Sequence, residues 1–226
     1  MTTKKLPLNV ILASGSPRRK QLLEDAGIKF VVYRPTQEVD ETLEPDDKKE
    51  PAAAVKKLAE RKAGAVVQDI LSQNPTGAGL IIGADTTVVL DGEMMGKPYS
   101  ADHAREMLHK LSGRTHQVIT GVSVWLVMLG EPTEDQPDGT VSMGFRSFHE
   151  TSHVTFKDLS DDDIRRYVAT GETIDKAGAY AIQGKGAALV DHHEGDYNNI
   201  VGLPVDRLIE AFPDIKEGFI EIEVAE

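Results

Sequence analysis

The sequence predicts an α/β protein, and three observations lead to this fold class. Segments with strand patterns and segments with helical patterns alternate along the chain. The chain has 226 residues, of which 40% are hydrophobic and 27% charged, as is typical of a folded protein with a sizeable core. It contains no internal repeat, no low-complexity tract and no run near the ~18 apolar residues of a membrane span.

The charge and cysteine content exclude several classes of function. The net charge is −12, which argues against general binding to nucleic-acid polymers or anionic membranes. The chain has no cysteine, and therefore no disulfide, zinc–thiolate site or thiol nucleophile. The N-terminal segment has too short an apolar run for a secretory signal, so the sequence predicts a cytoplasmic protein.

The first half of the chain begins with a strand followed by a helix. Short apolar runs next to Pro or Gly predict the strands, and Ser16-Pro17 is typical of an N-cap and first helical residue. Asp91-Gly92 predicts a tight turn. The predicted elements are a strand at 8–13, a helix at 17–26, a strand at 28–33, a polar loop at 35–51, a helix at 52–67 and a strand at 80–90.

The second half continues the same alternation. Ser160 followed by three aspartates is typical of a capped helix start, and Ile220, Ile222 and Val224 alternate as in a strand. The predicted elements are a helix at 101–111, a strand at 117–129, a surface loop at 130–148, a strand before Ser160, a helix from there to about 170, strands at 178–183 and 187–191, a helix at 204–212 and a terminal strand.

The turn after the first strand is the first candidate site. Small residues from Ser14 to Ser16 precede a helix whose first N–H groups lack partners, and such a helix end favours anions. Arg18 and Arg19 could add bidentate contacts to a phosphate. The alternative is a capped surface helix with two solvated arginines.

Asp85 is the second candidate. It follows Gly83 inside an apolar stretch, where we expect the strand to break or bulge. The carboxylate could bind a divalent cation or accept a proton from water. Equally, Asp85 could only cap a turn.

Other polar residues are weaker candidates on their own. Lys97 in a rigid loop could pair with phosphate, and Glu41 and Lys62 are further charged candidates, but all three could be ordinary solvated residues. In the glycine-rich segment 175–187, Tyr180 and Gln183 could read a flat polar ring, because Gln183 offers both a donor and an acceptor. The alternative is a hairpin without a ligand.

The adjacent histidines 192 and 193 would point to opposite faces of a strand, so we do not expect them to chelate a metal together.

Taken together and in this order, the motifs resemble the Maf family of nucleoside triphosphate pyrophosphatases. The resemblance covers residues 11–212, and it rests on these stretches: LASGSPRRKQLL, VDE, LAERKA, IIGADTTV, GKP, LSGRTHQVITGV, DKAGAYAIQG and GDYNNIVGLP.

The resemblance implies an activity and a fold. The family hydrolyses the bond between the α- and β-phosphates of a nucleotide with the help of a divalent cation, Mg²⁺ or Mn²⁺. The implied fold is a Maf/ITPase-like elongated mixed sheet flanked by helices, with a cleft between two lobes, forming one domain over residues 1–226. The family is usually homodimeric. Binding of the nucleotide without turnover, in a regulator of growth or division, is the alternative function.

The resemblance also assigns roles to particular residues. Asp85 matches the proton acceptor, and Asp85 and Glu41 would hold the metal. Arg18, Thr86 and Gln183 match the positions that separate the subgroups, and here they look like the group that prefers dTTP and UTP. The other substrate-binding matches are Ser14, Arg19, Lys62 and Lys97. The long loop at 130–148 departs from the family pattern as an insertion.

Overall fold

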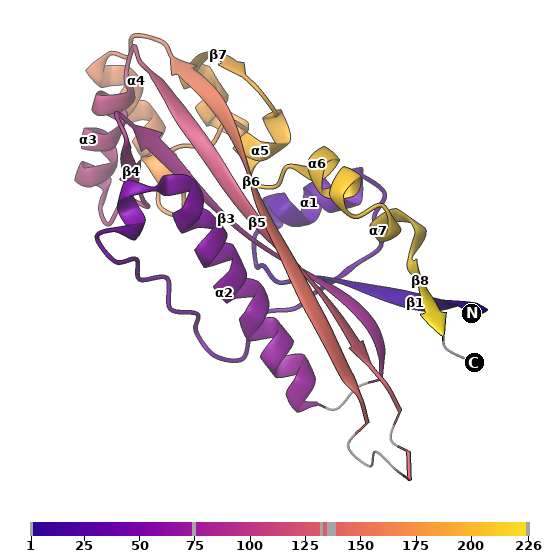
Figure 1. The fold of residues 1–226 in the computed structure, drawn as a ribbon. Helices are drawn as coiled ribbons and strands as arrows, with labels where there is room; N and C mark the ends of the chain where they lie inside the picture. Colours follow the sequence, from indigo (N-terminus) through magenta and orange to yellow (C-terminus); the bar gives the residue numbers. More distant parts are fainter. Residues whose placement is uncertain (1, 74–75, 132, 135–138, 225–226) are drawn as a thin grey trace.

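The computed structural model describes residues 2–73, 76–131, 133–134 and 139–224 (Figure 1). Its first half contains β1 (Thr2–Leu12), α1 (Pro17–Asp25), β2 (Val31–Val32), η1 (Asp47–Lys49), α2 (Pro51–Ser72), β3 (Gly77–Leu90), β4 (Glu93–Met95) and α3 (Ala101–Leu111). Its second half contains β5 (Thr115–Leu129), β6 (Val141–Phe156), α4 (Asp161–Val168), η2 (Ala177–Ala179), η3 (Gly184–Leu189), β7 (Val190–Glu194), α5 (Tyr197–Val201), α6 (Val205–Ala211), α7 (Asp214–Glu217) and β8 (Phe219–Val224). The predicted α/β class is confirmed.

Within the described residues, eight strands form one mixed sheet, in which the main path runs β2-β1-β3-β5-β6-β7. β1 is parallel to β2 and β3, whereas β5 is antiparallel to both β3 and β6. The first half of β1 pairs with β8 instead, which brings the two ends of the chain side by side (Figure 1). The long β3, β5 and β6 give the sheet the elongated shape that the family resemblance implies.

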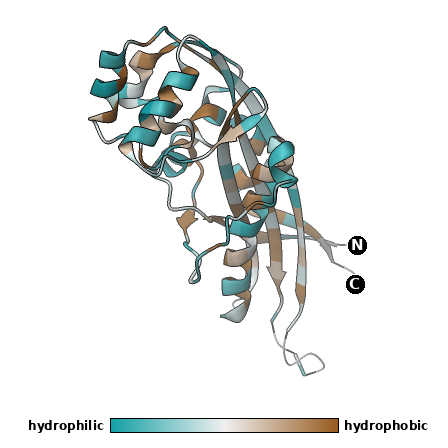
Figure 2. Ribbon diagram, turned by 90° about the vertical axis from the view of Figure 1, so that its left-hand side faces the viewer, coloured by the Kyte–Doolittle hydropathy of each residue, from teal (hydrophilic) through white to brown (hydrophobic). Residues whose placement is uncertain are grey.

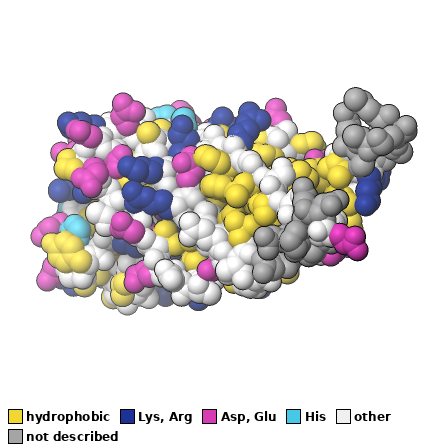
Figure 3. Space-filling model, turned by 60° about the horizontal axis from the view of Figure 1, so that its bottom comes forward, with side chains coloured by type: hydrophobic (Ala, Val, Ile, Leu, Met, Phe, Trp, Pro, Cys, Tyr) yellow, Lys and Arg dark blue, Asp and Glu magenta, His cyan; other side chains and the backbone are white. Residues whose placement is uncertain are grey.

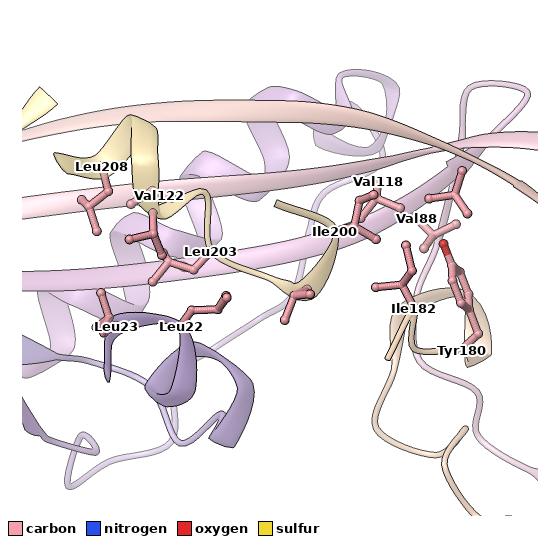
Figure 4. Close-up of a cluster of buried hydrophobic side chains, with 14 of the residues drawn as sticks. Leu22, Leu23, Val88, Val118, Val122, Tyr180, Ile182, Ile200, Leu203 and Leu208 are labelled. Carbon is pink, nitrogen blue, oxygen red and sulfur yellow. The ribbon is translucent and has the colours of Figure 1, made fainter. Parts of the chain in front are cut away.

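Helices cover both faces of the sheet. α2 packs along β3 and β5 on one face, and α1, α5 and α6 lie on the other (Figure 1). Figure 2 shows hydrophobic strands between helices whose outer surfaces are hydrophilic. On the α1 side, Leu22 and Leu23 lie in the same buried cluster as Leu203 and Leu208 (Figure 4). This packing fixes the start of α1 relative to the sheet.

Local signals in the sequence placed several element ends correctly. The Ser16 hydroxyl accepts a hydrogen bond from the Arg19 N–H at the start of α1, and Ser160 and Asp163 form a capping box at the start of α4. Asp91 and Gly92 both have positive φ, and they join β3 to β4 in a two-residue hairpin turn.

Four predicted segments differ most from the structure. Only Val31–Val32 of the strand predicted at 28–33 is paired. The segments 178–183 and 187–191 contain the short helices η2 and η3 before β7, because Gly178 and Gly184 adopt positive φ and turn the chain. The surface loop predicted at 130–148 ends earlier, since β6 begins at Val141 and pairs with β5 from there. Residues 132 and 135–138 of that loop lie outside the described part.

The expected break at Asp85 was also wrong. β3 pairs with β5 in one unbroken register from Gly77 to Val89, with Asp85 opposite Gly121. Gly83 serves close packing instead. A Cβ placed on Gly83 would lie 2.4 Å from the carbonyl oxygen of Ala59 in α2, and one on Gly121 would lie 2.4 Å from the carbonyl carbon of Val55. The two glycines therefore let α2 approach the sheet closely.

Hydrophobic side chains gather toward one end of the surface in Figure 3. The large exposed hydrophobic residues of the strands are Val31, Val32, Val141, Met143 and Phe145.

In the part of the chain that the structure describes, no helix is both long and apolar enough to cross a membrane.

Candidate active site

The site lies at a gap in the edge of β3. On the edge opposite β5, β1 pairs with β3 as far as Ile82, and β4 begins its pairing at Val88. Within the described residues no strand pairs with the segment between them on this edge. At about 3.3 Å per residue the gap is about 20 Å long. Asp85 lies at its midpoint.

A cleft of about 1340 Å³ opens at this gap, which is ample space for a nucleotide. All nine residues to which the family resemblance assigns a role line it, although they come from distant parts of the chain. They are Ser14, Arg18, Arg19, Glu41, Lys62, Asp85, Thr86, Lys97 and Gln183.

The turn from Ser14 to Ser16 forms one end of the cleft. The Ser14 hydroxyl accepts hydrogen bonds from the Ser16 N–H at 3.2 Å and from the Arg19 guanidinium at 3.3 Å. Ala13 continues the pairing of β1, because its N–H donates to the carbonyl of Ile82 at 2.8 Å. The turn is thus held against β3, and the start of α1 points into the cleft.

Arg19 and Arg18 differ in their surroundings. Arg19 Nε donates to the carbonyl of Gly202 at 2.8 Å, and Nη2 donates to the Thr86 hydroxyl at 3.1 Å. Burial lowers the pKa of Arg19, and the negative charge of Asp85 opposes that shift. Burial also lowers the pKa of Arg18, and the negative charge of Asp175 opposes that shift. Arg19 is therefore fixed by the protein, whereas the Arg18 guanidinium donates to no group among the described residues and keeps its hydrogen-bond donors for a ligand.

Thr86 is held from the other side by a buried chain of hydrogen bonds. Its hydroxyl lies 2.9 Å from that of Thr120, which donates to the carbonyl of Asn199 at 2.9 Å. The Asn199 amide in turn donates to the carbonyl of Val118 at 3.0 Å. The segment around Asn199 thereby sets the position of Thr86 and, through it, of Arg19.

Lys62 joins the two candidate metal ligands. Its ammonium nitrogen lies 2.6 Å from Asp85 Oδ1 and 2.9 Å from Glu41 Oε1. The close approach of α2 over Gly83 and Gly121 brings Lys62 to this position. The Lys62 and Asp85 side chains are only 17% and 14% exposed, so the pair is little screened by solvent.

The two carboxylates suit a magnesium ion. Burial raises the pKa of Glu41, but the hydrogen bond and charge of Lys62, with the charges of Lys97 and Arg19, outweigh it and leave the pKa lowered. In the described residues no group of three or more His, Cys, Asp or Glu side chains could hold a metal alone. Mg²⁺ in nucleotide enzymes commonly takes one or two carboxylates and substrate phosphates. The convergence of two carboxylate oxygens on one cation, the Lys62 ammonium, fits that pattern.

The other end of the cleft is formed by η2 and the segment after it. A Cβ on Gly178 would lie 2.8 Å from the Val88 side chain, so this segment packs where the gap in β3 ends. Gln183 is exposed at the rim of the cleft. Tyr180 is 5% exposed and its hydroxyl lies 2.7 Å from His116 Nε2, so its hydroxyl is engaged inside the protein. Of the two candidates for reading a base, only Gln183 has side-chain polar atoms without a partner among the described residues.

Two cationic residues of the cleft were not singled out from the sequence. Arg34 follows β2, and Lys176 precedes η2. Arg34 lies outside the quoted motifs and directly before the segment 35–51, whose polar composition predicts only a loop. Lys176 lay inside DKAGAYAIQG and is paired with Asp175. The histidines at 192 and 193 lie on exposed β7, away from the cleft.

Comparisons with known proteins find similarity over nearly the whole chain. Residues 9–215 match the family described as Maf-like protein. A dTTP/UTP pyrophosphatase of Bacillus velezensis is 44% identical over 94% of this chain and 97% of its own length. One of Dictyoglomus thermophilum is 46% identical over 88% of this chain and 92% of its own length. One of Bacillus cytotoxicus is 43% identical over 92% of this chain and 96% of its own length.

Proposed function

Because the chain belongs to the Maf-like protein family, we propose that it is a nucleoside triphosphate pyrophosphatase that hydrolyses dTTP and UTP to the monophosphate and pyrophosphate. The names of its relatives support this activity. The observation that carries the proposal for this chain is the gap in β3. Along β3, Asp85 lies about 10 Å from Ile82, to which the turn at residues 14–16 is tied through Ala13, and about 10 Å from Val88.

This spacing suits a nucleotide lying along β3. The base lies near Gln183, whose amide both donates and accepts hydrogen bonds. The β- and γ-phosphates lie toward the turn at Ser14, where α1 begins and Arg18 has free donors. The α-phosphate then lies opposite Asp85, halfway between the two ends.

Asp85 is arranged to accept a proton. Its Oδ1 is held by Lys62, and among the described residues Oδ2 receives no hydrogen bond. We assign Oδ2 the proton of the attacking water. The water oxygen forms a bond to the α-phosphorus, and the bond from that phosphorus to the bridging oxygen breaks. Arg18, Arg19, Lys62 and Lys97 stabilise the negative charge of the departing pyrophosphate.

A divalent cation held by Asp85, Glu41 and the phosphates would neutralise substrate charge and so lower the repulsion of the water. Metal dependence in general follows from the family. The assignment of Mg²⁺ or Mn²⁺ to these two carboxylates is part of the proposal, as are the site roles above.

The test measures both products from dTTP and UTP with Mg²⁺. We expect equal amounts of pyrophosphate and nucleoside monophosphate, and no release with EDTA. Asp85→Asn should abolish turnover while nucleotide binding persists. Orthophosphate release would contradict the bond assignment. Binding without turnover in the wild type would instead favour a nucleotide-responsive regulator.

The homodimer and the single domain over residues 1–226 remain proposals from the family resemblance, and the cytoplasmic location remains a proposal from the short apolar run of the N-terminal segment. Sedimentation of the purified chain, with an expected mass of twice 24.6 kDa, tests the first.

A further inference from the structure

The cationic side chains of the cleft fall into two groups. Arg19, Lys62 and Lys176 are engaged by the protein itself. Within the described residues, the side chains of Arg18, Arg34 and Lys97 form no hydrogen bond or ion pair. An arginine brings five N–H donors, and a cleft arginine that uses none of them is available to a ligand. Arg34 belongs to this second group and has no role in the mechanism above.

Arg34 lies directly against the turn at residues 14–16, toward which the β- and γ-phosphates are proposed to lie. A Cβ placed on Gly15 would be 2.8 Å from Arg34 Nε and 3.0 Å from Cζ. Gly15 is not among the glycines with positive φ, so backbone conformation does not demand a glycine there. The space that Gly15 leaves allows the guanidinium to approach the backbone of the turn.

The backbone on both sides of Arg34 is anchored. The N–H of Tyr33 donates to the carbonyl of Leu12 at 3.0 Å, which ties this side to β1. On the other side, Asp69 of α2 accepts hydrogen bonds from the N–H and the hydroxyl of Thr36, both at 2.7 Å. Because these contacts hold the segment in place, little ordering is needed when Arg34 binds a ligand.

Arg34 lies at the end of the cleft away from the base. It follows β2, the edge strand beyond β1, whereas Gln183 follows η2, which packs against Val88 at the far end of the gap in β3. A nucleotide with its base at Gln183 and its α-phosphate at Asp85 extends its remaining phosphates toward β1 and β2. The last phosphate is the group nearest Arg34.

We propose that Arg34 binds the terminal phosphate and gives this cleft its preference for a chain of three phosphates over two. The inference rests on the proposed function, because it uses the same orientation of the nucleotide. The planar guanidinium matches two oxygens of a terminal phosphate, which a diphosphate lacks at that position.

The experiment measures binding of two analogues that cannot be hydrolysed, α,β-methylene-UTP and α,β-methylene-UDP, by calorimetry with Mg²⁺. Arg34→Ala should weaken the triphosphate analogue about 10- to 100-fold, the usual range for a lost charged hydrogen-bond pair. The diphosphate analogue should change less than about 3-fold. Arg34→Lys should recover part of the loss, since it keeps the charge without the fork.

Two further variants serve as a control and as a second test of the contact between Arg34 and Gly15. Arg146→Ala removes an exposed arginine of β6 outside the cleft and should change neither affinity. Gly15→Ala should move the Arg34 guanidinium and shift the preference in the same direction as Arg34→Ala. In a protein that already carries Arg34→Ala, it should shift the preference little further.

The outcomes separate this inference from the proposed function. Equal loss for both analogues, or no loss for either, would overturn the role of Arg34. Failure of both analogues to bind the wild type would overturn the nucleotide site and the inference together. Selective loss in a protein that releases no pyrophosphate from UTP would support Arg34 and contradict the pyrophosphatase activity.

Discussion

Replacement of Lys62 by methionine should strengthen binding of a divalent cation in the absence of nucleotide. In the structure the Lys62 ammonium lies between Asp85 Oδ1 and Glu41 Oε1, at 2.6 Å and 2.9 Å. If these carboxylates hold the metal, the ammonium repels the ion from the same oxygens. Lys62→Met keeps most of the side-chain volume and removes that charge.

The size of the effect follows from the geometry. An ion bound about 2.1 Å from these oxygens lies about 4 Å from the position of the Lys62 nitrogen. Two unit charges at that distance interact by about 1 kcal/mol even in water, so at this less screened site a divalent ion is repelled by at least about 2 kcal/mol. The dissociation constant for Mn²⁺ should therefore fall at least roughly 30-fold in the variant.

The assay is titration with Mn²⁺ at low ionic strength, with free Mn²⁺ followed by electron paramagnetic resonance. Lys57→Met is the matched control, because Lys57 also lies on α2 and pairs with a carboxylate, Asp47, at 2.7 Å outside the cleft. Adding Glu41→Gln to Lys62→Met should reverse the gain. Equal Mn²⁺ affinity in the wild type and Lys62→Met would refute the metal assignment.

Three further predictions concern stability and the support of the site. Thr120→Val should lower the free energy of unfolding, measured in urea, by about 1 kcal/mol, because the Thr86 hydroxyl loses its buried partner. The same change should lower kcat/KM. Burial lowers the pKa of His116 to about 4, below about 6.5 in the unfolded chain, so stability should fall by up to about 3 kcal/mol from pH 6.5 to 4. His116→Phe should flatten that slope. Gly83→Ala should destabilise by about 2 kcal/mol or more, because its Cβ meets the Ala59 carbonyl.

A specific result would contradict each of these three predictions. An unchanged kcat/KM in Thr120→Val would show that Thr86 needs no support from Thr120. For His116, a wild-type slope retained in His116→Phe would assign the proton uptake to other groups. Gly144→Ala is the control for Gly83→Ala, since a Cβ on Gly144 meets nothing within 4 Å. Equal stability of these two glycine variants would contradict the close approach of α2.

Local signals in the sequence were reliable where neighbouring residues decide the structure. Ser16 and Ser160 marked helix starts because their hydroxyls accept hydrogen bonds from N–H groups three residues on. Asp91-Gly92 marked a hairpin because few other pairs adopt positive φ at both positions.

Features that depend on distant segments could not be predicted in this way. Gly83 suggested a bulge, but its role is to admit α2, whose position is set by packing across the sheet. Arg18 and Arg19 are equivalent in the sequence, yet only Arg19 is held by Gly202 and Thr86. Arg34 carried no motif, and its importance depends on its approach to Gly15. Family resemblance identified cleft residues, while the structure shows which of them are already engaged.

A crystal structure of Asp85→Asn with UTP and Mg²⁺ would show whether a nucleoside triphosphate lies along the gap in β3. We predict the base at Gln183, the α-phosphate opposite residue 85 and the terminal phosphate at Gly15 and Arg34. A triphosphate bound outside the cleft, or lying in it with base and phosphates exchanged, would refute this orientation and the proposed roles of these residues.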